Sequence, residues 1–423
     1  MCATRKVFGW GLVIWLACSF AAVSAAQVIV RWAEYPRAGM DDFKRLATER
    51  FNARYPDIRV VYEPVTDATK LTVAMAGGTA PDVVTWWTDT LQGWGESGLI
   101  IDLDPFVKRD LSEADLADFN PGQMKAFRLG SGYLYALPLF GGTWATWFNA
   151  DKFDEAGVPR PSSDWNWDAL VATARKLTRY DGNQVVQWGV QAAMNLERMT
   201  PFLRQNGAEL HPDGDNSACL LNQPAAVTAI DFVAGLIHRH NVMPIGGFEG
   251  VEAFKAGKVA LEFEGSWAVN WYLSLTEYRL GLVEPPRGPV ARSSIVAFEG
   301  YGITRNSANT DAAWQWLKFL TSRDANEMRA LTLGLQPARR SAAMVWFGRL
   351  RETYPGAADT NLDAFLQAWS YAAPQPMYSD QRIAAPLLEA GLVRILRRGE
   401  LAQTVLDEVV PAVNAALAQA KDR

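Results

Sequence analysis

The stretch FKAGKVALEFEGSWAV, residues 254–269, carries the pattern on which the fold prediction rests. It predicts the end of a helix, a glycine turn at Gly257 and a buried strand over residues 259–263, because a short apolar run bounded by glycines is typical of a covered strand in an α/β sheet. The corner Gly265-Ser266 then leads into a second helix that carries Trp267 on its first turn. Open α/β folds place ligands at the carboxyl ends of their strands, so this corner is a candidate binding site. No nucleophile with a neighbouring base occurs in the stretch, which favours binding over catalysis.

Strands and helices alternate in the same way upstream of this stretch. Strands are predicted at residues 27–33, 58–63 and 82–86, and helices at residues 41–52 and 70–75. An order of strand, helix, strand, helix, strand is typical of a parallel, doubly wound unit.

A second unit follows an extended run at residues 133–140. Helices are predicted at residues 151–156, 167–178, 224–240, 250–256, 312–321, 385–398 and 401–420. Residues 294–304 are expected to form a pair of strands that returns to the first unit. Crossings near residues 138–144, 284–296 and 333–339 then predict two discontinuous lobes, an N-terminal lobe of residues 27–139 plus 290–335 and a C-terminal lobe of residues 140–289 plus 336–423.

The first 26 residues have the features of a secretory signal peptide. Arg5 and Lys6 precede an apolar run over residues 7–22, and small residues precede Gln27. The run is shorter than the ~20 apolar residues that a membrane span needs. We therefore predict export to the periplasm or the cell surface, with a lipid anchor on Cys18 as an alternative.

The composition excludes several classes of partner and site. Removal of residues 1–26 leaves 397 of 423 residues, a length that suggests two domains. It takes away two positive and no negative charges, so the net charge changes from −5 to −7, which argues against nucleic acid or an anionic membrane as a partner. Only Cys219 remains, so no internal disulfide is expected, and three histidines are too few for a metal site. The seventeen tryptophans exceed what a core needs and leave several for a binding surface.

Several further stretches match the landmarks of one family in order and spacing. The chain resembles the extracytoplasmic solute-binding proteins of ATP-driven sugar importers, the group that includes maltose-binding protein. No single stretch is specific, and their order along the chain carries the resemblance. The stretches are FNARYPDIRV (51–60), AGGTAPDVV (76–84), LYALP (134–138), WFNADKF (147–153), AGVP (156–159), LNQPA (221–225), residues 254–267 and AAWQWLKF (312–319).

The resemblance implies a fold and a function. The expected fold is of the α/β class and periplasmic-binding-protein-like, with two discontinuous α/β lobes joined by hinge strands around a ligand cleft. The expected function is to bind a mono- or oligosaccharide in that cleft and to deliver it to the membrane permease subunits of an ABC transporter. The resemblance implies no enzymatic activity, no cofactor and a monomeric protein.

A sugar offers a face of C–H groups and a rim of hydroxyls, so its site needs aromatic faces and hydrogen-bonding groups. The resemblance places a ring-stacking aromatic at Trp86 and a hydroxyl-binding carboxylate at Asp89, after the third strand. Trp87 is the alternative aromatic, because neighbours on a strand point to opposite faces. Trp267 matches the aromatic of the family's Gly-Pro-Trp corner, where Ser266 replaces the proline.

Further candidates lie near predicted strand ends, crossings and prolines. They are Glu34, Tyr35, Thr143, Trp144, Glu264, Tyr301, Arg339 and Tyr378. Glu264 is equally suited to capping the next helix, and Arg37 is an alternative to Glu34 and Tyr35.

Three other functions stay open at this point. Arg37 and Arg339 would suit a binding protein for glycerol phosphate or another polyol derivative. An exported carbohydrate-active enzyme is more remote, since Glu262 and Glu264 form a carboxylate pair but the resemblance gives them no acid–base role. A sensory binding protein that docks to a receptor is the third.

Overall fold

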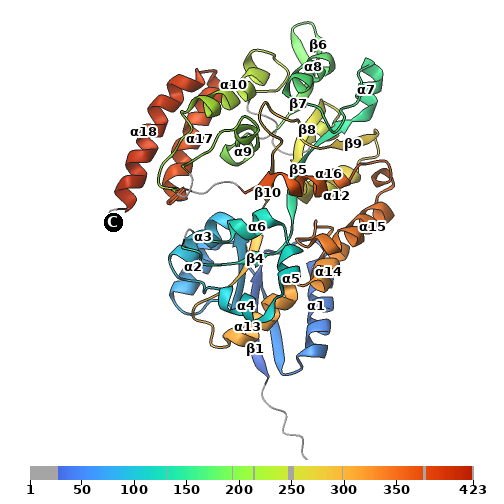
Figure 1. Ribbon diagram of the computed structural model, residues 1–423. Helices are drawn as coiled ribbons and strands as arrows, with labels where there is room; N and C mark the ends of the chain where they lie inside the picture. Colours follow the sequence, from blue (N-terminus) through green and yellow to red (C-terminus); the bar gives the residue numbers. More distant parts are fainter. Residues whose placement is uncertain are drawn as a thin grey trace, which may run out of the picture.

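The computed structural model describes residues 27–129, 131–192, 194–212, 215–245, 252–297, 299–374 and 378–421. The predicted signal peptide and the alternative anchor at Cys18 lie outside these residues. Two lobes follow one another from bottom to top in Figure 1, and the chain crosses between them more than once. The expected two-lobed α/β fold is therefore confirmed.

The first lobe contains a five-stranded sheet in the order β2-β1-β3-β11-β4. β1 (Val28–Glu34) pairs in parallel with β2 (Ile58–Pro64) and β3 (Val83–Trp87), as the sequence predicted. β11 (Glu299–Ile303) is antiparallel to both β3 and β4 (Leu137–Pro138). β1 begins at the bottom of the molecule in Figure 1, so the carboxyl ends of β1, β2 and β3 face the second lobe.

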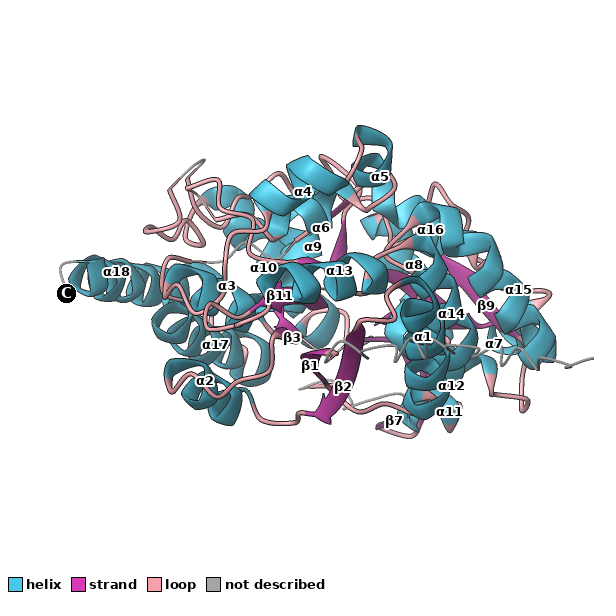
Figure 2. Ribbon diagram, turned by 90° about the horizontal axis from the view of Figure 1, so that it is seen from below, coloured by secondary structure: helices cyan, strands magenta, loops and turns pink. Residues whose placement is uncertain are grey.

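Helices cover both faces of this sheet. α1 and α14 lie beside each other (Figure 2), and α1 buries Phe43, Ala47 and Phe51, which recur every four residues along one helix face. Trp32 and Trp316 are fully buried in the same core. The helices of the lobe are α1 (Met40–Arg54), α2 (Ala68–Ala76), α3 (Thr88–Glu96), α4 (Asp104–Asp110), α5 (Glu113–Ala117), α6 (Pro121–Ala126), α13 (Thr310–Leu320) and α14 (Arg323–Leu333).

The second lobe contains a seven-stranded sheet in the order β12-β10-β5-β8-β7-β6, with β9 also paired to β5. β8 (Val259–Gly265) is buried along its whole length between β5 and β7, which confirms the covered strand predicted at residues 259–263. Trp144 and Phe148 of β5 enter one core while Ala145 and Trp147 enter another, so both faces of the sheet are covered. The other strands are β5 (Gly142–Asn149), β6 (Arg179–Asp181), β7 (Gln184–Gln191), β9 (Leu280–Val283), β10 (Ser294–Ala297) and β12 (Ala372–Ala373).

The helices of the second lobe include a C-terminal pair, α17 and α18, which pack against each other and against α10 (Figure 1). The α-helices are α7 (Ala150–Ala156), α8 (Trp167–Leu177), α9 (Leu196–Gln205), α10 (Pro224–His238), α11 (Glu252–Lys255), α12 (Val269–Leu273), α15 (Ala343–Thr353), α16 (Asp363–Gln367), α17 (Gln381–Arg398) and α18 (Ala402–Lys421). Short 3-10 turns are η1 (Ser266–Ala268), η2 (Arg340–Ala342), η3 (Pro355–Ala357) and η4 (Ala368–Ser370).

The chain crosses between the lobes at three places. The first crossing joins β4 to β5, the second joins β10 to β11, and the third joins α14 to η2. The prediction that residues 294–304 return together to the first unit is wrong for β10, which pairs with β5 in the second sheet. Because β10 belongs to the second sheet and β11 to the first, the chain changes sheet after β10 and not at the predicted lobe boundary of residue 290.

Candidate functional site in the groove between the lobes

Two exposed aromatic side chains stand at the carboxyl edge of the first sheet. Trp87 ends β3 and is 43% exposed, and Tyr35 directly follows β1. Their ring centroids lie 6.0 Å apart with the planes at 61°. Trp86 points to the opposite face of the strand, is only 8% exposed, and supports Trp87 edge-on at 5.1 Å. Trp87 therefore presents its ring at the surface, where the sequence had favoured Trp86.

A groove opens between the lobes at α3, the helix that directly follows Trp87; the rings of Tyr35 and Trp87 are not part of its lining. It encloses about 580 Å³ and is lined by α3 of the first lobe and by the first turns of α9 and α17 of the second. Asp89, at the start of α3, lines it with an exposed carboxylate. Sites for small ligands typically have volumes of about 300–1,000 Å³. The groove thus has the size and the interlobe position of a ligand site.

Carboxylates dominate the charge of the groove. Asp89 and Glu96 line it from the first lobe, and Glu197 and Glu389 from the second. Burial raises the pKa of Glu197, and the carboxylates of Asp89, Glu264 and Glu389 raise it further against the opposing effect of Arg198. The Asp89–Glu197 interaction spans the two lobes. Carboxylates are strong acceptors for hydroxyl groups, so this lining suits a ligand with many hydroxyls.

The corner after β8 contributes an aromatic from the second lobe. Trp267 is half-buried on η1, and the Arg198 guanidinium lies 5.8 Å from the centre of its ring. A Cβ on Gly265 would come within 2.2 Å of that ring, so only glycine allows the indole to fold back over the corner. The predicted glycine corner with an aromatic after it is therefore present.

Glu264 and Arg198 form a pair beneath this aromatic. Both terminal nitrogens of Arg198 approach the carboxylate of Glu264, at 3.1 and 3.2 Å, and the backbone N–H of Gly265 donates to it at 2.8 Å. Glu264 therefore holds Arg198 in place.

Sequence reasoning missed Glu197 and Arg198, which begin α9. The side chain of Asn195 caps this helix by accepting a bond from Arg198 N at 2.9 Å. An asparagine suited to N-capping, at position 195, was the signal available in the sequence.

Comparison with known proteins decides the family. A family model described as bacterial extracellular solute-binding protein matches residues 36–327. The chain belongs to this family. The resemblance identified from the sequence is therefore confirmed, and with it the expectation of a binding protein instead of an enzyme.

Individual proteins to which the chain is similar share about a quarter or less of its residues. A maltotriose-binding protein of Pyrococcus abyssi is 24% identical over 73% of this chain and 66% of its own length. An ABC substrate-binding protein of Listeria monocytogenes, solved in complex with cycloalternan, has 20% identity and a TM-score of 0.77, covering 93% of this chain and 99% of its own. A cyclic alpha-maltosyl-1,6-maltose binding protein of Arthrobacter globiformis has 19% identity and a TM-score of 0.78, covering 92% and 99%. At these identities the solved structures establish the shared fold. No helix among the described residues is long and apolar enough to cross a membrane.

Two of the predicted site residues of this binding protein are buried in strands of the first sheet, Glu34 in β1 and Tyr301 in β11. Glu34 is fully buried, with its carboxylate 2.6 Å from both the hydroxyl of Tyr301 and a guanidinium nitrogen of Arg329. Tyr301 is also fully buried. Their polar atoms are committed to one another and not exposed to a ligand.

Three predicted residues lie inside the second lobe. Thr143 donates its hydroxyl to Phe365 O at 2.7 Å, and Trp144 packs between Phe202 and Phe263. Tyr378 borders the groove but is buried, and its hydroxyl donates to the buried Cys219 sulfur at 3.2 Å. These positions result from tertiary contacts that the local sequence does not reveal.

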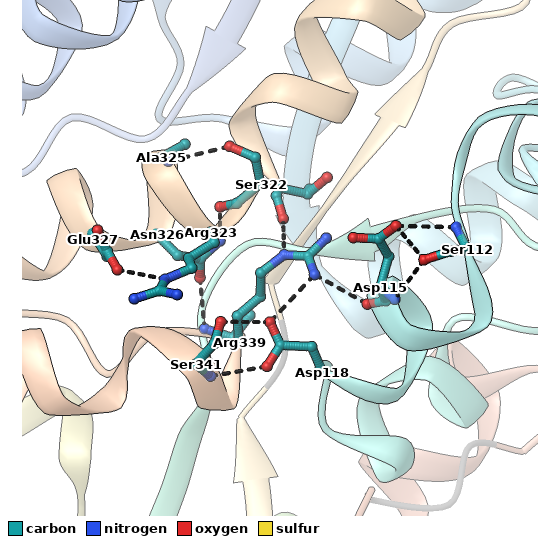
Figure 3. Close-up of polar contacts among 12 residues, drawn as sticks. Ser112, Asp115, Asp118, Ser322, Arg323, Ala325, Asn326, Glu327, Arg339 and Ser341 are labelled. Carbon is teal, nitrogen blue, oxygen red and sulfur yellow. Dashed lines mark hydrogen bonds and ion pairs between the residues drawn. The ribbon is translucent and has the colours of Figure 1, made fainter.

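Arg339 does not reach the groove. Its Nε donates to Thr321 O at 2.5 Å, and one terminal nitrogen donates to Asp115 O at 3.0 Å (Figure 3). Its guanidinium also lies 4.1 Å from the centre of the Phe119 ring. Asp118 also binds it, at 3.4 Å. Arg339 thus joins the third crossing to the ends of α5 and α13 in the first lobe. The prediction that Arg339 lies on the ligand rim is therefore wrong.

The structure also bears on two other kinds of site, one for a phosphorylated ligand and one for a metal ion. Arg37 is paired with Glu299, so neither arginine that would suit a phosphorylated ligand is free. Among the described residues, no group of three or more His, Cys, Asp or Glu side chains is placed to hold a metal ion.

Proposed function

We propose that this binding protein holds an oligosaccharide in the groove between its lobes. The observation that carries the proposal is the exposed Tyr35–Trp87 pair at the edge of the first sheet, where Trp87 directly precedes α3, a helix that lines a carboxylate-rich groove. Aromatic faces cover the C–H surface of a sugar ring, and carboxylates accept its hydroxyls. Relatives in the family support this class of ligand, since their names give maltotriose, cycloalternan and cyclic alpha-maltosyl-1,6-maltose.

The proposed site combines groups from both lobes. Tyr35, Trp87 and Asp89 contact the ligand from the first lobe, and Trp267, Glu197 and Arg198 contact it from the second. Trp86 supports Trp87 from behind. A ligand that touches both lobes stabilises the closed arrangement over the open one, because only the closed form makes all the contacts. The protein then acts as a monomer outside the cytoplasmic membrane, and its closed form delivers the sugar to the permease subunits of an ABC importer.

Titration calorimetry of the purified protein tests this proposal. Maltotriose, longer and cyclic glucans, glucose and glycerol 3-phosphate form the panel. A dissociation constant near 1 μM, about −8 kcal/mol, is expected for an oligosaccharide, with the sugar recovered unchanged. Binding of glycerol 3-phosphate alone, or steady product formation, would contradict the proposal.

A variant pair locates the site. Trp87→Ala should weaken binding by about 1–2 kcal/mol, a factor of about 5 to 30. Tyr180→Ala is the matched control, since Tyr180 is an exposed aromatic on the edge strand β6, at the outer end of the second lobe (Figure 1). It should leave binding unchanged. Equal effects of the two changes would refute the proposed site.

A further inference from the structure

A network of buried charges lies directly behind the aromatic pair of the first lobe. Glu34, Tyr301 and Arg329 are buried and bonded to one another. Arg37 joins this group from the loop after β1, with a terminal nitrogen 3.5 Å from Glu34. Glu299, the first residue of β11, is 4% exposed and completes the network.

Glu299 holds Arg37 through both carboxylate oxygens. One terminal nitrogen of Arg37 donates to Oε1 and to Oε2 of Glu299. Burial raises the pKa of Glu299, and the adjacent Arg37 opposes that effect. A buried carboxylate is costly unless a cation pairs with it, so Glu299 needs Arg37 at this place.

Arg37 in turn contacts the aromatic pair. Its guanidinium carbon lies 5.6 Å from the centre of the Tyr35 ring, and a terminal nitrogen lies 3.4 Å from Tyr35 O. Tyr35 packs edge-on against Trp87. Glu299 also stands directly opposite Trp87 in the β11–β3 ladder. Glu299 is therefore linked to Tyr35 through the side chain of Arg37, and to Trp87 through the pairing of strands β11 and β3.

The same residue lies at the junction of the crossings between the lobes. Glu299 follows the second crossing, and its carbonyl accepts a bond from Leu139 N of the first crossing at 2.9 Å. Arg329 lies on α14, which leads into the third crossing. A rotation of one lobe against the other changes the backbone at these crossings, so Glu299 lies where lobe movement and the aromatic pair meet.

We propose that Glu299 is a positioning residue of the binding site: through Arg37 it orients Tyr35 against Trp87, and through the crossings it couples this aromatic pair to opening and closing of the lobes. The proposal rests on the proposed function for its link to sugar binding. The orientation of Trp87 can be measured without any ligand.

The first measurement is iodide quenching of tryptophan fluorescence. The signal of Trp87 is the difference between each protein and the same protein carrying Trp87→Phe. Glu299→Gln should change the quenching of Trp87, because Arg37 loses its charged partner and releases Tyr35. Glu63→Gln is the matched control, since Glu63 pairs with Arg31 in the same lobe at a partly exposed site. It should leave Trp87 quenching unchanged.

The second measurement is titration of the same variants with maltotriose. Glu299→Gln should weaken binding about tenfold, as expected when a contact surface is no longer pre-organised. Glu299→Asp keeps the carboxylate and should recover most of that loss, and both variants should melt as cooperatively as the wild type. Unchanged Trp87 quenching in folded Glu299→Gln, or an equal change in Glu63→Gln, would overturn the proposal. If the wild type binds no sugar, the proposed function fails, and the quenching comparison still decides the positioning role.

Discussion

The hydroxyl of Ser266 donates a hydrogen bond to the side-chain oxygen of Gln336, and so joins the corner that carries Trp267 to the third crossing between the lobes. Thr143 N of β5, just after the first crossing, lies 3.3 Å from both Ser266 Oγ and Gln336 Oε1. All three residues are buried. The serine that replaces proline in the corner therefore supplies a bond that proline has no group to make.

Ser266→Ala should destabilise the protein by about 1–3 kcal/mol, because it removes the shortest of the hydrogen bonds to a buried oxygen of Gln336 and leaves the longer ones from Thr143. Urea unfolding measures the change. Ser274→Ala is the control: Ser274 is exposed and its hydroxyl donates to Trp271 O in the preceding turn, so its loss should stay within about 0.5 kcal/mol. Equal stability of wild type and Ser266→Ala would show that the bond contributes nothing.

Trp86 and Trp87 should respond to alanine in opposite ways. Trp86→Ala removes a buried indole from the first core and should cost about 3–5 kcal/mol of stability. Trp87→Ala removes an exposed ring, so stability should change little while oligosaccharide affinity falls. Thermal unfolding and calorimetry on both variants separate the two roles. If Trp86→Ala lost more affinity per folded molecule than Trp87→Ala, Trp86 and not Trp87 would be the residue that contacts the ligand.

The stability of the protein should depend on pH through Glu262. Burial raises the pKa of this carboxyl to about 8 from an ordinary value of 4.5, and the nearby Glu264 raises it too, while Gln191 donates to it at 2.6 Å. Between these two pH values the unfolded chain ionises Glu262 and the native protein keeps the proton. The native state therefore binds more protons there, and stability falls as pH rises, by about 1.4 kcal/mol per pH unit from this group.

Glu262→Gln keeps the acceptor for Gln191 and removes the titration. The stability of the variant should be closest to that of the wild type below pH 4.5. Between pH 4.5 and about pH 8 the variant should become steadily more stable relative to the wild type, and above that the difference should be constant. Guanidinium unfolding of both proteins at a series of pH values measures this difference. A difference that does not change across the window would contradict a protonated Glu262 in the native state.

The sequence could predict elements whose pattern is local. β8 was predicted because apolar residues between glycines need cover on both faces, and α1 because Phe43, Ala47 and Phe51 recur at helical spacing. The site was harder. Alternation along β3 predicts that Trp86 and Trp87 face apart, but the packing of the whole sheet decides which one is exposed.

Charged residues were the least predictable, because their partners lie far along the chain. Arg339 pairs with Asp118, 221 positions away, and Arg37 pairs with Glu299, 262 positions away. Glu34 is near Arg37 in sequence and lies 3.5 Å from it, but the partners that bind the two guanidinium groups most closely, Glu299 and Thr321 O, cannot be inferred from the neighbouring sequence. An arginine near a crossing therefore looks like a ligand contact until the fold supplies its partner.

Replacement of Arg339 tests whether this arginine stabilises the fold or contacts the ligand. Arg339→Met leaves Asp118 without its cation and removes the donor to Thr321 O, so it should destabilise the protein by about 3–5 kcal/mol. Affinity for oligosaccharide, measured well below the melting temperature, should not change, because the guanidinium lies outside the groove. Arg323→Met is the matched control, since Arg323 is exposed and pairs with Glu327 one turn along α14, so its replacement should change stability little. Calorimetric titration and urea unfolding of the two variants decide the matter: a stable Arg339→Met protein with weakened sugar binding would restore Arg339 to the ligand rim.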